Sequence, residues 1–242
     1  VYNHLGPEAN YLAEFGWSFT NRYHTPWGKA INYDDRHSEP VRDFVLQNVR
    51  MWFRDFHMDG LRLDAAQCIF DIGPQHLLAD LQLVAEEEAA KFGREPYIVA
   101  ESDMNNVKLM QPPETGGYGL DAQWSDDFHH ALHAHLTGER TGYYEDYSDP
   151  VPQLVKAWNS AFIYDGLYSE YRDRRQGAST RGMPGHHFVI CTQNHDQVGN
   201  RALGNRLTTM LSGPQLRFAA ALMLLAPQTP MLFMGEEYGE RA

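Results

Sequence analysis

Short apolar runs that end in polar residues recur along this chain, and they constrain its fold more than any other feature. The runs cover residues 60–65, 96–102, 119–124, 187–196 and 230–237. They are continuously apolar instead of alternating, which is typical of parallel strands buried on both faces. Residues 1–4 look like the tail of an earlier strand of the same kind.

Amphipathic patterns separate these runs. Apolar residues repeat at helical spacing within residues 39–58, where we expect Val41, Phe44, Val49, Phe53 and Phe56 to form one stripe. Further helices are expected within residues 73–93, 154–162 and 215–226. Alternating strands and helices predict an α/β fold. No glycine-rich phosphate turn follows a strand, which favours a (β/α)8 TIM barrel over a dinucleotide-binding sheet.

Composition excludes several classes of protein. The 242 residues are 43% hydrophobic, with a formal net charge of -12, so we expect a globular domain and no nucleic-acid partner. No apolar run reaches membrane-spanning length and no signal peptide is visible, so we expect no membrane partner and a cytoplasmic location. Cys68 and Cys191 are expected to be small buried residues, not a disulfide framework.

The chain begins with valine and stops just after the last predicted strand. We therefore expect residues 1–242 to be an incomplete catalytic barrel domain, without its N-terminal strands and its flanking domains. Missing strands would leave unpaired edges, so we expect this piece alone to be unstable or inactive.

The segments between the predicted elements are long and rich in tyrosine, tryptophan and histidine. They cover residues 5–35, 104–117, 137–149 and 164–185. Loops of this length in a compact domain are usually functional or disordered. The aromatic content favours binding loops.

Acidic and basic side chains follow the predicted strands at the points where they end. In a parallel barrel these ends form the active site. The residues concerned are His4, Asp64, Glu101, His195 and Asp196, with Arg62 two positions before Asp64. Arg62 alternates with Leu61 and Leu63 and therefore points the same way as Asp64, where its guanidinium would hold Asp64 ionised and oriented.

Two carboxylates in different environments are what glycoside hydrolysis requires. Asp64 beside Arg62 suits a nucleophile. Glu101 follows the apolar residues 97–100, so its pKa could be raised for acid/base work. Asp196 would stabilise the transition state or bind sugar hydroxyls. Each acid alone is more often a cap or a structural ion pair, and the histidine next to Asp196 could belong to a metal site; only the joint pattern favours catalysis.

The motifs VYNH, GLRLDAA, VAES and TQNHD resemble the four short regions of the α-amylase superfamily of glycoside hydrolases. The resemblance implies a barrel that runs from the end of the third strand to the eighth. It implies Asp64 as nucleophile, Glu101 as general acid/base and Asp196 as transition-state stabiliser. It also implies that Arg62 orients Asp64, and that His4 and His195 contact the sugar. The aspartate that opens the first region in the family would lie before Val1.

Further stretches, including DAQWSDDFHH and PMLFMGEEYGE, are similar to the maltooligosyltrehalose trehalohydrolases of that superfamily. The likeness implies release of trehalose by hydrolysis of the adjacent α-1,4 bond. It makes four more residues candidates for substrate binding: Trp27, Tyr143, Tyr171 and Arg172. Asp127 is a further candidate, which would face the trehalose side of the cleft. Asp127 could instead cap a helix that begins near Phe128.

Two alternative functions stay open. A glycogen branching enzyme would use the same carboxylates to transfer the glucan, although Ser102 stands where branching enzymes usually have an acidic residue. A non-catalytic glucan-binding barrel would tend to lose them. We expect no cofactor and no metal, because the pairs His129-His130 and His186-His187 lack ligand spacing and no carboxylate-rich loop favours calcium.

Overall fold

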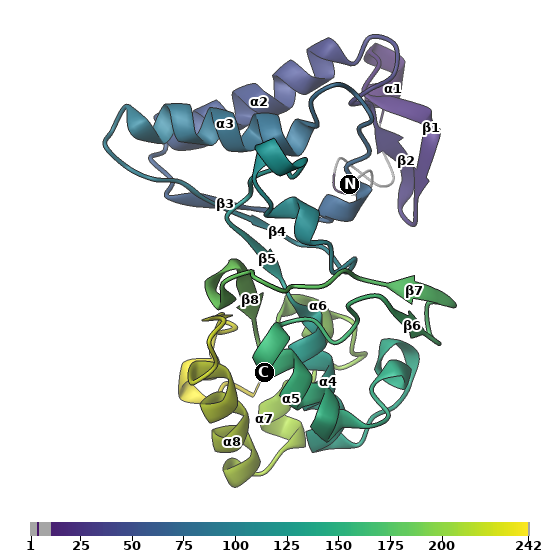
Figure 1. Cartoon of the computed structure of the whole chain (residues 1–242), viewed down its shortest axis with the longest axis vertical. Helices are drawn as coiled ribbons and strands as arrows, with labels where there is room; N and C mark the ends of the chain where they lie inside the picture. The colour runs from purple at the N-terminus through teal and green to yellow at the C-terminus, as the bar shows by residue number, and fades with distance from the viewer. Residues whose placement is uncertain (1–3, 5–10, 242) are drawn as a thin grey trace. The chain divides into compact units, whose positions relative to one another are not determined.

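The computed structural model describes residue 4 and residues 11–241, and these divide into two compact units. The first unit holds the described residues up to Ser102 together with Lys108–Gln123. The second holds Asp103–Val107 and the residues from Trp124 onward. Figure 1 shows the elements of both.

Three parallel strands form the centre of the first unit. β3 (Gly60–Leu63) pairs with β4 (Tyr97–Ala100), and β4 pairs with the beginning of β5 (Ala122–Trp124). In this register Leu63 lies opposite Ala100. Both strands therefore end at the same level, which brings the residues that follow them to one edge of the sheet.

Helices α2 (Glu39–Arg54) and α3 (Leu77–Ala90) lie side by side on one side of these strands (Figure 1). Parallel strands need such a crossover, and α3 supplies it between β3 and β4. Helix α2 has proline in its first turn, and Val49 and Phe53 are buried. The predicted stripe is wrong at two positions, because Phe44 and Phe56 are 73% and 58% exposed.

The prediction of a loop over residues 5–35 is wrong for much of its length. A short helix, α1 (Leu12–Phe15), precedes an antiparallel hairpin of β1 (Phe19–Thr25) and β2 (Gly28–Ile31). Its turn contains Trp27 and Gly28, whose φ of 132° suits glycine. The proline and glycine of the sequence TPWGK are the local signal for this turn.

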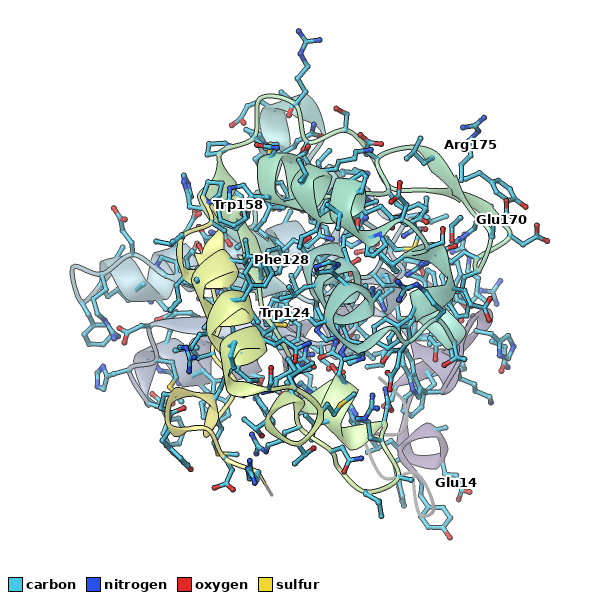
Figure 2. The ribbon with its side chains drawn as sticks, turned by 90° about the horizontal axis from the view of Figure 1, so that it is seen from below. Glu14, Trp124, Phe128, Trp158, Glu170 and Arg175 are labelled. Carbon is cyan, nitrogen blue, oxygen red and sulfur yellow. The ribbon has the colours of Figure 1, made fainter. Side chains whose placement is uncertain are left out.

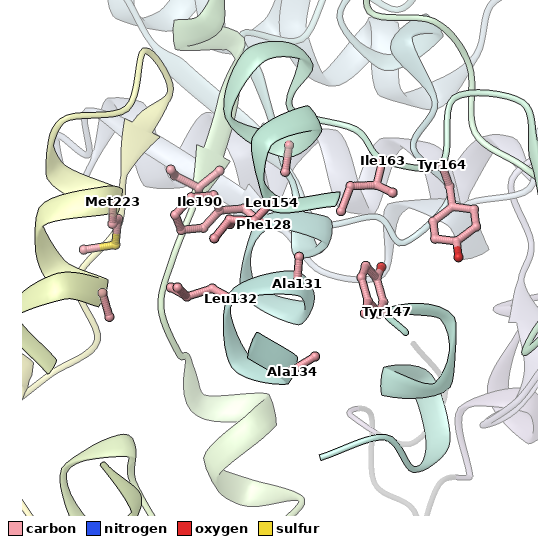
Figure 3. Close-up of a cluster of buried hydrophobic side chains, with 12 residues drawn as sticks. Phe128, Ala131, Leu132, Ala134, Tyr147, Leu154, Ile163, Tyr164, Ile190 and Met223 are labelled. Carbon is pink, nitrogen blue, oxygen red and sulfur yellow. The ribbon is translucent and has the colours of Figure 1, made fainter. Parts of the chain in front are cut away.

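Helices α4 (Asp126–Thr137) and α5 (Pro150–Ser160) lie side by side in the second unit, next to the parallel pair of β8 (Phe188–Ile190) and β9 (Thr229–Pro230). Figure 3 shows apolar side chains of α4, β8 and α8 (Gly213–Leu224) packed together. Phe128, Leu132, Ile190 and Met223 are almost completely buried there. This core holds β8 and α8, the two elements that flank the segment of His195 and Asp196.

Two predictions for the second unit are wrong. The segment 164–185 contains a hairpin of β6 (Leu167–Ser169) and β7 (Arg174–Gln176), from which Glu170 and Arg175 project in Figure 2. The last predicted strand, 230–237, extends only to Pro230, and Glu236–Tyr238 form a 3-10 helix. Gly235, with φ 88°, turns the backbone out of an extended path.

Two short helices, α6 (His195–Gly199) and α7 (Leu207–Met210), connect β8 to α8. Among the described residues, none of the helices combines the length and the apolar character needed to cross a bilayer.

Candidate active site

Arg62 contacts two carboxylates at the end of the parallel strands of the first unit. Its Nη1 donates to Oδ1 of Asp64 at 2.7 Å, and its Nη2 lies 2.8 Å from Oε2 of Glu101. The three side chains are 28%, 35% and 22% exposed, so a ligand can reach them. The expected contact between Arg62 and Asp64 is therefore present, and the same guanidinium also reaches Glu101.

The backbone around these residues is tightly connected. The N–H of Glu101 donates to the carbonyl of Leu63 at 2.9 Å, and the N–H of Ala66 donates to the carbonyl of Glu101 at 2.8 Å. Between them, the N–H of Ala65 donates to Oε2 of Glu101 at 2.7 Å. Ala65 is left-handed, with φ 44° and ψ 49°, a costly conformation for a residue with a side chain.

These contacts correct one expectation. Glu101 was predicted to lie in an apolar setting, and this is wrong, because the guanidinium of Arg62 lies beside its carboxylate and a backbone N–H donates to it. The apolar residues of β4 come directly before Glu101, but they do not form the surroundings of its carboxylate. Those surroundings are formed by Arg62 and by the backbone of Ala65, which lie at the end of the neighbouring strand.

His4 lies beside Asp64. Its Nδ1 is 3.2 Å from Oδ2 of Asp64, whereas Arg62 donates to the other oxygen, Oδ1. The rest of the expected first motif, residues 1–3, lies outside the described residues. Asp64 thus has an imidazole next to one oxygen and a guanidinium next to the other.

A cavity of about 80 Å³ connects Asp64 with the β1–β2 hairpin. Asp64, Ala65 and Cys68 line one side of it, and Thr25 and Lys29 of the hairpin line another. Cys68 is therefore not the fully buried residue expected, whereas Cys191 is buried and its burial raises the pKa of its thiol. Trp27, at the tip of the same hairpin, is 43% exposed.

The second unit presents His195 and Asp196 at the beginning of α6. Both side chains are about half exposed, and Nε2 of His195 lies 3.4 Å from Oδ1 of Asp196. The ring of Trp124 meets His195 edge-on, with centroids 6.2 Å apart. Asn194 caps the helix, since its Oδ1 accepts from the N–H of Asp196 at 2.8 Å.

Asp127 is a buried residue whose carboxylate is hydrogen-bonded within the protein. It is 4% exposed and accepts hydrogen bonds from Tyr147 Oη (2.5 Å), Asn105 Nδ2 (2.8 Å) and the N–H groups of Ile163 (2.6 Å) and Tyr164 (3.0 Å). Four donors saturate a carboxylate. The structure therefore gives Asp127 the role of joining α4 to the segment before β6, and its burial keeps it away from a substrate.

Tyr171 and Arg172 lie at the turn of the β6–β7 hairpin. Arg172 is 3.7 Å from both Asp103 and Asp146, and its guanidinium lies 5.9 Å from the ring centroid of Tyr171, which is 48% exposed. The N–H of Tyr171 donates to Asp146 at 3.0 Å. Tyr143 is half-buried and stacks on His130 at 4.7 Å.

The histidines of α4 are buried and hydrogen-bonded. Burial lowers the pKa of His129 to about 3, with a smaller contribution from His133, and burial also lowers the pKa of His130. His129 contacts the carbonyl of Thr192 and Tyr144 Oη, at 2.6 and 3.0 Å. Within residues 4 and 11–241, no three His, Cys, Asp or Glu side chains are arranged to hold a metal ion.

Glu236 is a residue to which the sequence argument gave no role. Its carboxylate accepts hydrogen bonds from Thr192 Oγ1 and from the N–H of Phe233, the latter at 3.0 Å. Burial nevertheless raises its pKa. Only its place after the last apolar run could have drawn attention to it.

Comparisons with known proteins give this geometry a context. No protein-family model matches the chain. It is 48% identical, over 99% of its length, to a malto-oligosyltrehalose trehalohydrolase of Saccharolobus solfataricus, of which it covers 42%. A crystal structure of a Salmonella typhimurium protein described as an alpha amylase matches with TM-score 0.89 and 37% identity, over 98% of this chain and 40% of that one.

A more distant relative is a 1,4-alpha-glucan branching enzyme of Leifsonia xyli. It is 24% identical over 90% of this chain, which covers 28% of it. The chain thus spans about two fifths of the length of the trehalohydrolase and of the Salmonella protein.

Three observations point to the same kind of protein. They are the parallel α/β arrangement, the two carboxylates that contact Arg62, and the sequence identity along the chain. Over nearly its whole length this chain is similar in sequence to part of the malto-oligosyltrehalose trehalohydrolases, and its structure resembles part of an alpha amylase.

Proposed function

We propose that this chain supplies catalytic residues of a retaining glycoside hydrolase. The enzyme would release trehalose by hydrolysing the α-1,4 bond next to the terminal trehalose of a maltooligosyltrehalose. One observation supports this most directly: Arg62 contacts both Asp64 and Glu101, so two carboxylates lie together at strand ends that a ligand can reach. The homology along the chain favours trehalose as the product.

In the proposed first step, Asp64 attacks the anomeric carbon while Glu101 donates its proton to the glycosidic oxygen, and trehalose leaves. The C–O bond to trehalose breaks as the bond to Asp64 forms. In the second step Glu101 takes a proton from water, whose oxygen attacks the same carbon and frees Asp64. Arg62 orients Asp64 for the attack through its hydrogen bond to Oδ1.

Glu101 must carry a proton in the first step and lose it in the second. Arg62 and the N–H of Ala65 both lie against its carboxylate, the group that takes up the proton in the second step. Asp196 as transition-state stabiliser, and His4 and His195 as contacts to the sugar, complete the proposal. Both histidines are solvent-exposed and lie next to a proposed catalytic aspartate.

Four further residues are proposed to bind sugar rings: Trp27, Tyr143, Tyr171 and Arg172. Trp27 and Tyr171 are exposed at hairpin turns, where a flat ring can meet a pyranose. Asp127 is left out of this set, because its hydrogen bonds to the protein already occupy it.

We also propose that the chain forms part of a (β/α)8 barrel, from the end of the third strand to the eighth, within one catalytic domain. The parallel pairs β3–β4 and β8–β9 and the crossover helix α3 support this. A cytoplasmic location and the absence of a nucleic-acid partner stay predictions.

A branching enzyme is the second candidate, since one is related to this chain at 24% identity. A non-catalytic glucan-binding barrel is the third, and the retention of Asp64, Glu101 and Asp196 speaks against it. Incubating the full-length protein with maltooligosyltrehalose and measuring free trehalose against new branch points separates the three. We expect trehalose, and none from Asp64→Asn. Branch points without trehalose would overturn the hydrolase, and full turnover by Asp64→Asn would overturn the nucleophile.

A further inference from the structure

Helix α6, which carries His195 and Asp196, depends on contacts outside the helix for its position. α6 has five residues, none of them buried. Helices this short are unstable alone, so contacts outside the helix must fix its position. A capping box between Asn194 and Gln197 fixes its beginning, with hydrogen bonds of 2.8 and 3.4 Å.

Arg201, two residues beyond α6, fixes its end. The N–H of Arg201 donates to the carbonyl of Val198 at 3.2 Å, which continues the helical turn. Its guanidinium holds both oxygens of Glu139, with Nη2 at 2.6 Å from Oε1 and Nη1 at 3.1 Å from Oε2. A two-point contact of this kind sets direction as well as distance.

Glu139 is itself held on a rigid element. It follows α4 after Gly138, whose φ of 79° ends the helix, and its N–H donates to Thr137 Oγ1 at 3.2 Å. His133 Nε2 lies 2.8 Å from Oε2 of Glu139, and its side chain is 3% exposed. His133 also stacks on Tyr144 with centroids 4.4 Å apart. Residues of α4 therefore hold the Glu139 carboxylate in place independently of its contact with Arg201.

The contact is kept at any pH at which an enzyme of this class would be assayed. Arg201 and, less strongly, His133 lower the pKa of Glu139 to about 2. Glu139 is therefore ionised throughout. A small void between His133, Gln197 and Arg201, of about 10 Å³, is too small for a ligand. This leaves a mechanical role for the cluster.

We propose that Glu139, acting through Arg201, is a positioning residue for Asp196, and that His133 orients Glu139 for this contact. The inference rests on the proposed function, in which Asp196 stabilises the transition state. Glu139 does not touch the substrate in this account. It sets the angle at which α6 presents Asp196.

The test is a double-mutant cycle in the full-length protein, with Glu139→Gln, Asp196→Asn and both together, assayed for trehalose release. Asp165→Asn is the matched control, because Asp165 forms a 2.8 Å ion pair with Lys156 in the same unit and with similar exposure. We expect Glu139→Gln to lower kcat about ten- to a hundred-fold with little change in KM, as misplacement of a catalytic group does. Asp165→Asn should leave kcat unchanged.

The double mutant decides how Glu139 acts. If it acts through Asp196, adding Glu139→Gln to Asp196→Asn causes almost no further loss of kcat. Multiplicative losses, or a fall in Tm with kcat unchanged, would overturn the inference. If Asp196→Asn alone leaves kcat intact, the proposed function is what fails. Should Glu139→Gln not fold, Arg201→Lys keeps the charge but loses the two-point contact and is expected to give the same non-additivity.

Discussion

The N–H of Ala65 donates a 2.7 Å hydrogen bond to the carboxylate of Glu101, although 36 residues separate the two along the chain. Ala65 directly follows Asp64. The backbone next to Asp64 is thus hydrogen-bonded to the side chain of Glu101, so the two proposed catalytic residues are linked. Ala65 has a left-handed conformation in this arrangement.

The first prediction concerns that conformation. Ala65→Val should lower the free energy of unfolding by about 1–3 kcal/mol and reduce kcat, because a β-branched residue resists φ 44° and would turn the N–H away from Glu101. Ala65→Gly is the control, since glycine adopts this conformation without strain and keeps the N–H. Stopped assays and urea unfolding of both variants measure the effect. Equal activity of the two variants would count against the role of the backbone.

The second prediction concerns the shared guanidinium. Arg62→Lys should reduce kcat at least about a hundred-fold, because lysine cannot contact Asp64 and Glu101 at fixed relative angles. Arg50→Lys is a close control, since Arg50 is also 28% exposed and also bridges two carboxylates, those of Glu87 and Glu88 on α3. It should retain kcat. An equal loss in both variants would point to a general effect of losing an arginine.

The third prediction concerns Asp127. Asp127→Asn should destabilise the fold by about 2–4 kcal/mol, because an amide cannot accept all the hydrogen bonds that the carboxylate receives. The KM of the folded variant should not change. Asp126→Asn, one residue earlier and less buried, should have a smaller effect on stability. A raised KM with normal Tm would return Asp127 to the substrate-binding set.

The fourth prediction concerns acid stability. Burial lowers the pKa of His129 to about 3, against 6.5 for an ordinary histidine. Between these values the unfolded chain binds a proton that the folded chain does not, so the free energy of unfolding decreases as pH falls from about 6.5 toward 3. The lowered pKa values of His130 and His133 act in the same direction.

Urea unfolding of the full-length protein between pH 4 and pH 8 measures this dependence. The slope of the unfolding free energy against pH reports how many protons are taken up on unfolding. His129→Gln should reduce that number by up to about one, since it removes one titrating group. His186→Gln is the control, because His186 lies outside the buried cluster on α4. An unchanged slope for His129→Gln would show that His129 is charged in the folded protein or does not govern acid unfolding.

Local pattern was enough to locate the strand ends. Asp64 and Glu101 each follow a short apolar run, and runs of this type form parallel strands whose carboxyl ends share one edge. The pairing of Leu63 with Ala100 confirms that edge. The alternation of Leu61, Arg62 and Leu63 likewise predicted that Arg62 faces Asp64, because successive strand side chains point to opposite sides.

What the sequence by itself determined, then, was which residues follow β3 and β4, since this depends on near neighbours. Only the tertiary structure decided their surroundings. Glu101 proved to be held by Arg62 and Ala65, Asp127 by four donors from distant segments, and the stretch around Trp27 by a hairpin. Hydrogen bonds and ion pairs join whatever residues folding brings within about 3 Å, and no local period encodes which residues those are.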